Sequence, residues 1–262
     1  MTGQVTEEHI TDKVDPARAA ALLATLGESV DVQVGRGLPL FAHHAFFWNP
    51  KTEENLAVDG HEVLGGLIPD LGLPLRMWAG GRLQQHAPFL AGVAADKRSR
   101  VTGVTRKQGK SGELAFVTVR HEVRQRNQMV LTEDQDIVYR EAKALTHEPP
   151  VVAESPDERR ALKLSEVTLF RYSALTFNAH RIHYDAGYCA TEGYPGLVVH
   201  GPLMAALLAN MAAEAGPVKT FEFRATSPLF LGDVAWLCRE GDAYWIEGPR
   251  RRLCMAATVV RG

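Results

Sequence analysis

The chain has 262 residues, a formal net charge of −2 at pH 7 and three cysteines. Hydrophobic residues make up 45% of it and charged residues 23%, the balance of a folded globular protein, which excludes a disordered or collagen-like chain. The near-neutral charge argues against a dedicated nucleic-acid binder, because such proteins carry a basic domain. The length leaves two alternatives open, one large fold or two copies of a small one.

The lack of a recognisable targeting signal and the cysteine spacing lead us to expect a cytoplasmic protein. The sequence holds no run of 18 or more apolar residues, so no membrane-spanning helix is predicted. Its first residues, MTGQVTEEHITDKVD, lack the apolar core of a secretory signal. Cys189, Cys238 and Cys254 are odd in number and form no CxxC pair, so we expect neither a disulfide framework nor a zinc site.

The first half of the chain predicts one helix and then a long sheet. Asp15 and Pro16 are typical of a helix start, and apolar residues at helical spacing extend the helix from Pro16 to Leu26. Residues 38–72 mix aromatics, prolines and glycines, which predicts loops with short helical turns. Alternating patterns then predict four long antiparallel strands, over residues 76–86, 92–106, 112–125 and 128–140.

The second half repeats this order around a more apolar helix. Residues 145–160 are rich in Pro, Glu and Ser and form the best linker candidate, and residues 164–198 mix helical and loop signals. The helix from Gly201 to Ala215 is apolar nearly all round, as buried helices are. Four strands are predicted after it, over residues 219–227, 233–240, 243–248 and 252–260. We therefore predict an α+β protein with units at 1–145 and 161–262, joined by a linker at 146–160.

The densest polar cluster runs from Arg171 to Asp185, and a His200-Gly201-Pro202 segment follows it at the start of the buried helix. The first amide groups of a helix lack internal partners and lie at the positive end of its dipole. An amide there stabilises a carbonyl oxygen that gains negative charge, and glycine lets a ligand approach the backbone closely. A nearby histidine exchanges protons near neutral pH. This combination suits thioester chemistry.

Several segments together resemble one known family. Asn178-x4-His183-x-Asp185, followed by Val199-His200-Gly201, is similar to the motif of the MaoC-like hot dog (R)-enoyl-thioester hydratases. The strings FRYSALTFNAHRIHYD and GYPGLVVHGPL resemble a narrower branch, the hydroxyacyl-thioester dehydratases of type 2 and the mesaconyl- or itaconyl-CoA hydratases. The resemblance is strong over about 165–260 and weaker over 35–140, where MWAGGR at 77–82 carries it. It implies a double hot dog, with a degenerate first half and a catalytic second half.

One residue departs from the wider family pattern. The family's catalytic aspartate falls on Asn178, whose amide cannot exchange a proton in the working pH range. We therefore expect a one-base site. In it His183 exchanges the proton, Asn178 orients the water, and the Gly201 amide holds the thioester oxygen. The alternative for His183 and Asn178 is a structural role in capping turns.

Three further residues are candidate substrate contacts. Arg181 either binds a substrate carboxylate or CoA phosphate or is a solvated side chain. Asp185 is interpreted mainly as the N-cap of a short helix over 186–192, and His200 as a group near the helix start. His180, His183 and Asp185 lack the spacing of an established metal site, so no metal is predicted.

The expected function is reversible hydration of an enoyl-CoA thioester by a hydro-lyase. The resemblance implies a short dicarboxylate substrate of the mesaconyl-C4-CoA or itaconyl-CoA type, with CoA as part of the substrate and no other cofactor. Three alternatives are a 3-hydroxyacyl-thioester dehydratase of longer chains, a hot dog thioesterase, and a non-catalytic acyl-CoA binder. We expect no nucleic-acid or membrane partner, and a homodimer of double hot dog chains.

Overall fold

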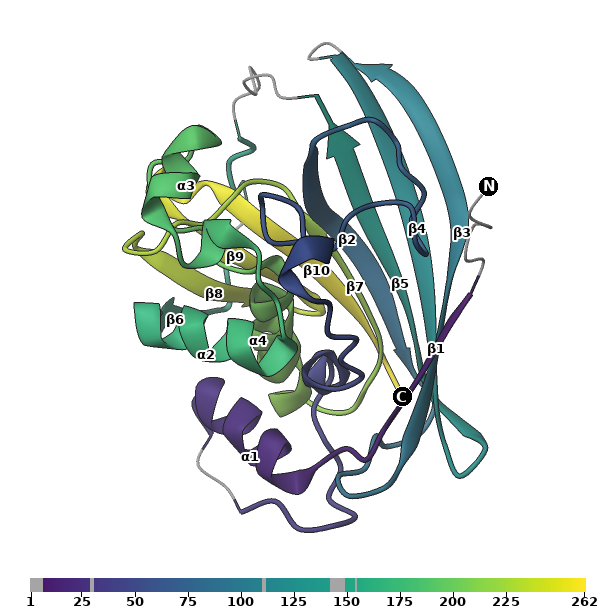
Figure 1. The fold of residues 1–262 in the computed structure, drawn as a ribbon. Coiled ribbons are helices and arrows are strands. Elements are labelled where there is room, and N and C mark those ends of the chain that lie inside the picture. Colours follow the sequence, from purple (N-terminus) through teal and green to yellow (C-terminus); the bar gives the residue numbers. More distant parts are fainter. Residues whose placement is uncertain (1–6, 29–30, 110–111, 142–148, 154) are drawn as a thin grey trace.

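The computed structural model describes residues 7–28, 31–109, 112–141, 149–153 and 155–262, and its strands form one ten-stranded antiparallel sheet (Figure 1). The order across the sheet is β1-β3-β4-β5-β2-β7-β10-β9-β8-β6. The strands are β1 Glu8–Asp12, β2 Leu75–Gln85, β3 Ala95–Gly109, β4 Gly112–Gln125, β5 Gln128–Arg140, β6 Glu158–Leu162, β7 Val218–Ala225, β8 Ala235–Glu240, β9 Ala243–Glu247 and β10 Leu253–Arg261. The α-helices are α1 Pro16–Thr25, α2 Glu166–Thr176, α3 Ala186–Thr191 and α4 Gly201–Glu214.

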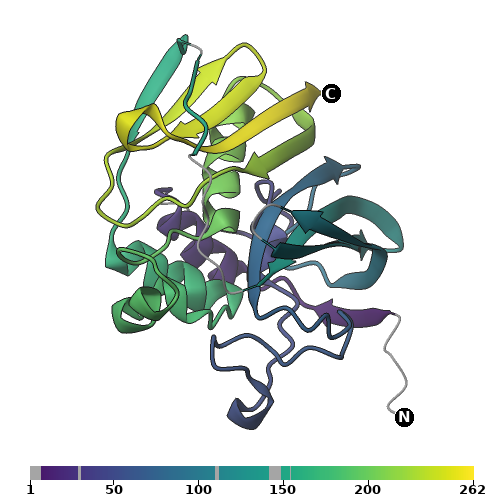
Figure 2. The same cartoon turned by 90° about the horizontal axis from the view of Figure 1, so that it is seen from above.

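The two halves of the chain meet at the β2–β7 pair, where the first half's sheet continues into the second half's (Figures 1 and 2). In this pair Leu83 lies opposite Phe221, and both side chains are fully buried. Backbone hydrogen bonds and a shared apolar core therefore join the halves. The internal pairing that a double hot dog chain requires is present.

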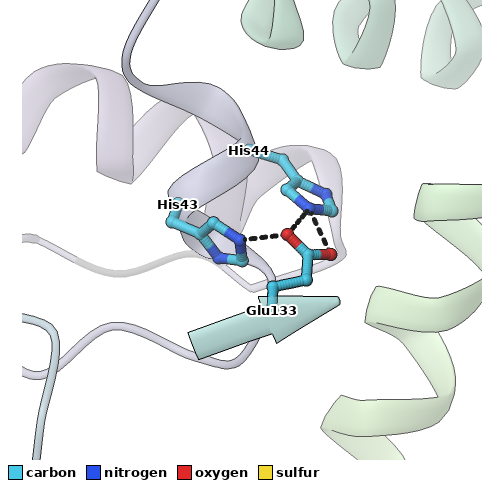
Figure 3. Close-up of side chains that lie close together, drawn as sticks. All are labelled: His43, His44 and Glu133. Carbon is cyan, nitrogen blue, oxygen red and sulfur yellow. Dashed lines mark hydrogen bonds and ion pairs between the residues drawn. The ribbon is translucent and has the colours of Figure 1, made fainter. Parts of the chain in front are cut away.

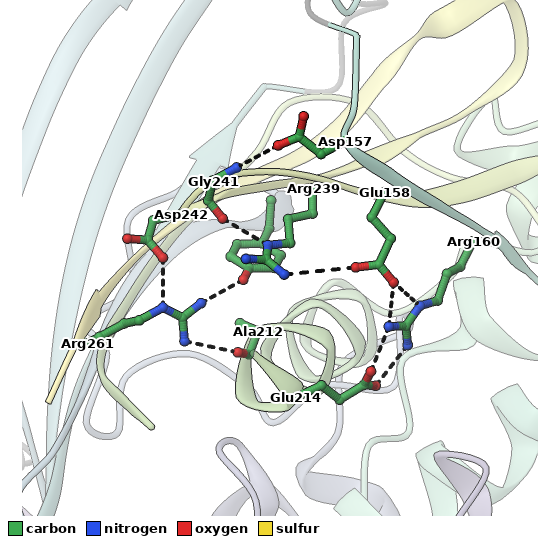
Figure 4. Close-up of polar contacts among 10 residues, drawn as sticks. Asp157, Glu158, Arg160, Ala212, Glu214, Arg239, Gly241, Asp242 and Arg261 are labelled. Carbon is green, nitrogen blue, oxygen red and sulfur yellow. Dashed lines mark hydrogen bonds and ion pairs between the residues drawn. The ribbon is translucent and has the colours of Figure 1, made fainter. Parts of the chain in front are cut away.

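α4 is the central helix of the second half. It contacts β7, β8, β9 and β10, and Leu203, Ala205 and Leu208 along it are fully buried. At its C-terminal end the Arg261 guanidinium donates to the carbonyl of Ala212 at 3.2 Å, so a cation faces the negative end of the helix dipole (Figure 4). The opposite end of α4, which begins at Gly201, faces the first half.

The same end of α4 is tied to the edge strands by ion pairs. Arg160 on β6 reaches Glu214 through two hydrogen bonds of 2.6 and 2.8 Å, and it also contacts Glu158 (Figure 4). These side chains are largely exposed, so each pair contributes little alone. They link the C-terminal end of the helix to β6, at the end away from Gly201.

The first half has no helix comparable to α4 among the described residues. Residues 38–73 instead form irregular chain with two single 3-10 turns, η1 Ala42–Ala45 and η2 Glu53–Asn55, as the sequence predicted. Phe41 packs edge-on against Phe221 and Phe223, with ring centroids 5.5 and 5.6 Å apart. α1 packs against α2, outside the first half's sheet. This irregular segment therefore fills the place that a central helix takes in the second half.

Most predicted elements are confirmed with shifted ends. Asp15 caps α1, its carboxylate accepting from the Ala17 amide at 2.9 Å, and α1 ends one residue before the predicted Leu26. The strand predicted at 92–106 runs from Ala95 to Gly109, and the one predicted at 233–240 begins only at Ala235.

Two short strands were not predicted. β1 pairs with β3, and β6 pairs with β8, so residues 158–160 of the predicted linker belong to the sheet. Residues 146–148 and 154 of that linker lie outside the described residues, as do residues 110–111 and 142–145. No helix in the described part of the chain is long and apolar enough to cross a membrane.

Candidate active site

The polar motif lies on the segment that leaves α2. The helix ends at Phe177 in a left-handed conformation, and the side-chain oxygen of Asn178 then accepts a hydrogen bond from the His180 amide at 3.0 Å. A single 3-10 turn, η3 Arg181–His183, follows. Asn178 thus closes the turn that presents the two histidines, which matches the structural alternative for this residue. Its predicted role in orienting water stays a prediction.

His183 has the geometry of a neutral base. Its side chain is buried, and its Nδ1 lies 2.7 Å from the Val198 carbonyl oxygen. Because a carbonyl only accepts, Nδ1 carries the proton, and Nε2 keeps a free lone pair. Burial lowers the pKa of His183 to about 4, which keeps the ring neutral at pH 7.

The start of α4 lies beside this imidazole. The His200 ring stacks on the His183 ring with centroids 3.6 Å apart, and His200 caps the helix that begins at Gly201. His200 is itself held by Ser173, whose Oγ lies 2.8 Å from Nε2. A Cβ on Gly201 would come within 3.0 Å of the Trp78 ring on β2. The structure therefore brings His183, His200 and Gly201 together, and Trp78 of the first half packs beside Gly201.

Arg181 and Asp185 are engaged with each other. Asp185 caps α3 by accepting from the Tyr188 amide at 2.9 Å, and it pairs with Arg181 at 2.7 Å. The Arg181 guanidinium also lies over the Tyr188 ring, 4.3 Å from its centroid. The predicted cap is confirmed. These contacts favour a structural role for both residues, and their substrate contacts stay predictions.

A loop of the first half completes the site, and the sequence alone did not predict it. His61 Nδ1 lies 2.9 Å from the Asp59 carboxylate, and the His61 ring lies 4.1 Å from the His180 ring. Burial lowers the pKa of His180 to about 2 and also lowers that of His61. Although burial opposes it, the hydrogen bond from His61 holds the pKa of Asp59 well below its usual value. An Asp-Gly-His tripeptide at 59–61 was the available signal.

A cavity of about 610 Å³ opens beside this loop. That volume is in the range of small-molecule sites. Its walls come from both halves and include Asp59, His61, Arg76, Tyr139 and Tyr188. His61 lines this cavity, whereas His183, His200 and Gly201 do not. The rings of His180 and His183 follow in turn from His61 towards the start of α4.

Two groups of side chains in the described residues have enough ligand atoms in reach of one another to hold a metal: His43, His44 and Glu133, and Asp59, His61 and His180. In the first group both imidazoles point at the Glu133 carboxylate, at 2.7 and 2.9 Å (Figure 3). Ligands around a tetrahedral zinc lie about 3.3 Å apart. These shorter separations are those of hydrogen bonds. They make this group a buried polar network in the first half.

Comparison with known proteins finds a matching family model and similar relatives. The family model for hydroxyacyl-thioester dehydratase type 2 matches residues 42–231. A mesaconyl-C(4)-CoA hydratase of Chloroflexus aurantiacus is 41% identical over 97% of this chain and 95% of its own length. A mitochondrial hydroxyacyl-thioester dehydratase type 2 of Schizosaccharomyces pombe is 26% identical over 84% of each chain.

Solved structures agree on the fold. HtdX of Mycobacterium tuberculosis superposes with a TM-score of 0.66 at 18% identity, covering 97% of this chain and all of that one. A second M. tuberculosis protein, described as having a double hotdog fold, gives a TM-score of 0.63 at 13% identity over 98% of this chain and 95% of its own. The α+β double hot dog predicted from the sequence is therefore confirmed.

Proposed function

Because the chain belongs to the hydroxyacyl-thioester dehydratase type 2 family and is a hydro-lyase of the MaoC-like type, we propose that it reversibly hydrates a short dicarboxylic enoyl-CoA thioester such as mesaconyl-C4-CoA or itaconyl-CoA. The single observation that carries the site assignment is the stack of His183 on His200 at the start of α4. It sets a neutral imidazole beside a helix N-terminus, which are the two groups that thioester hydration needs.

In the proposed mechanism the thioester oxygen lies at the Gly201 amide, which donates to no group that the structure describes. That amide and the helix dipole stabilise the oxygen as it gains enolate character. Nε2 of His183 takes the proton of the attacking water and returns it to the α-carbon. Microscopic reversibility assigns the same groups to dehydration. The Asn178 amide retains donor capacity for the water, since its oxygen is the atom used in the turn.

The substrate class rests on the relative of highest stated identity, which is named as acting on mesaconyl-C(4)-CoA. The family's name supports 3-hydroxyacyl thioesters of other chain lengths as the alternative. We further propose a cytoplasmic homodimer, which light scattering would test, and no cofactor beyond the CoA of the substrate.

The test is turnover of a panel of enoyl-CoAs. We expect mesaconyl-C4-CoA or itaconyl-CoA to be hydrated faster than crotonyl-CoA, and faster turnover of crotonyl-CoA would contradict the dicarboxylate preference. We expect His183→Ala to lose about 100-fold or more in kcat, the usual contribution of a general base. The control is His86→Ala, an exposed histidine on the loop after β2. Binding of the panel without turnover would contradict the catalytic proposal itself.

A further inference from the structure

The loop of residues 57–62, which we call the DGH loop, is docked onto the catalytic motif from the other half of the chain. The Arg181 amide donates to the Asp59 carbonyl at 2.9 Å, and the Arg181 guanidinium donates to the Val58 carbonyl at 3.2 Å. Gly60 has a φ of +90°, and a Cβ there would lie 2.0 Å from the Ala179 carbonyl oxygen. The two backbones are therefore in contact, at a separation that only glycine permits.

This docking places a carboxylate and an imidazole beside a motif that carries Asn178 at the position of the family's carboxylate. The Asp59 carboxylate accepts two hydrogen bonds from His61, one from its backbone amide and one from Nδ1, each 2.9 Å long. An ionised carboxylate only accepts, so Nδ1 carries the proton and Nε2 is left to face a ligand. An imidazole oriented in this way by a carboxylate is the arrangement of a general acid–base group.

We propose that His61, positioned by Asp59, is a second catalytic acid–base group. It acts on the oxygen at the β-carbon, so that His183 serves only the α-carbon rather than both positions as in the one-base scheme. This rests on the proposed function. It supplies from the first half the carboxylate-linked group that Asn178 lacks in the second half. It also gives a chemical role to the first half, which the resemblance implied to be degenerate.

The order of the imidazoles decides which carbon each one serves. His183 adjoins the start of α4 through His200, so it lies at the carbonyl end of a bound thioester. His61 lies beyond His180, with ring centroids 4.1 Å apart, and it lines the cavity. The α-carbon is bonded to the carbonyl carbon, and the β-carbon is one bond further away. The geometry therefore matches His183 to the α-carbon and His61 to the water.

The proton transfers balance in the dehydration direction. Neutral His183 first removes a proton from the α-carbon, leaving an enolate whose oxygen the Gly201 amide stabilises. The electron pair then forms the double bond as the bond between the β-carbon and oxygen breaks. The protonated form of His61, which burial disfavours and Asp59 stabilises, gives its Nε2 proton to the departing hydroxide, which leaves as water. His183 then holds the proton that it took from the α-carbon and His61 has lost one, and exchange with solvent in the cavity restores both. Hydration is the reverse.

The experiment compares His61→Gln, Asp59→Asn and the control His86→Gln in the full chain. His86 is an exposed histidine on the loop after β2 that does not line the cavity, and its Nε2 lies 3.1 Å from the Thr132 hydroxyl. Two reactions are followed on the 3-hydroxyacyl thioester, namely dehydration and exchange of the α-hydrogen with deuterated water. For His61→Gln we expect kcat of dehydration to fall about 100-fold or more. KM should change little and α-hydrogen exchange should persist.

Asp59→Asn separates positioning from direct chemistry. The amide oxygen still accepts from the His61 backbone, which keeps the loop in place, but loss of the charge lowers the pKa of His61. Because dehydration uses the protonated ring, we expect the alkaline limb of its pH profile to move to lower pH. His86→Gln should leave the rate and the profile unchanged.

Three results would overturn the inference. These are an unchanged kcat in His61→Gln, a rise in KM alone, or loss of exchange together with dehydration. A folded wild-type enzyme that neither hydrates nor dehydrates any thioester of the panel would instead overturn the proposed function, before any variant is compared.

Discussion

The protonation state of one residue, His183, sets the pH range of the chemistry. Its Nδ1 is fixed by the Val198 carbonyl, and burial lowers its pKa to about 4 from 6.5. Nε2 acts as a base only while the ring is neutral. We therefore expect kcat/KM for dehydration to fall on the acid side well below pH 6.5, towards pH 4. A pH profile of the wild type measures this limb, and an acid limb centred at 6.5 would show that the histidine is solvated in the working enzyme.

At the residue scale the sequence predicted the half of the site that one motif encodes. His183, His200 and Gly201 lie within 19 residues, on a turn and the helix that follows it, so their proximity followed from local spacing. Asp59 and His61 lie more than a hundred residues earlier, in a segment without periodicity. The pairing of β2 with β7 and the hydrogen bonds from Arg181 to the loop bring that segment to the motif. Nothing in the local sequence encodes that pairing.

At the element scale, the DGH loop depends on the absence of a side chain at Gly60. An alanine there would adopt an unfavourable positive φ and would also meet the Ala179 carbonyl oxygen. Gly65 is a matched control, since it has a φ of +109° and a Cβ at that position would have no atom within 4 Å. We expect Gly65→Ala to cost about 1–3 kcal/mol for the backbone alone.

For Gly60→Ala we expect a larger loss of unfolding free energy and a loss of activity, because the loop must leave the motif. Urea unfolding and turnover of both variants give the comparison. Equal losses in the two variants would contradict the close backbone approach.

Other elements show where sequence patterns stop being informative. α4 was predicted to within one residue because fourteen consecutive residues, apolar nearly all round, admit few other structures. β1 and β6 are five residues long with mostly half-buried or exposed side chains. Such edge strands form because a neighbouring strand offers hydrogen bonds, and the position of that neighbour is set by the tertiary structure. The irregular segment over 38–73 was correctly predicted as loops, but its contacts with the second half were not predicted.

At the scale of the whole molecule, the buried histidines lie in both halves and titrate together. His43 and His121 in the first half and His183 in the second each have a pKa lowered to about 4, mainly by burial, from 6.5 in the unfolded chain. Between pH 6.5 and 4 the unfolded chain therefore binds more protons than the folded one. The free energy of unfolding must then fall as the pH falls through this window.

We expect that loss to be on the order of 2 kcal/mol per histidine between pH 7 and pH 5, a range in which ordinary carboxyl groups stay ionised. Urea unfolding at several pH values measures it. Both halves should unfold in one transition, because the β2–β7 pair and the packing of Phe41 on Phe221 join them. His121→Gln should flatten the pH dependence by one titrating group, whereas His86→Gln, at an exposed position, should leave it unchanged. A stability that is flat from pH 7 to pH 5 would mean that water reaches these rings in the folded protein.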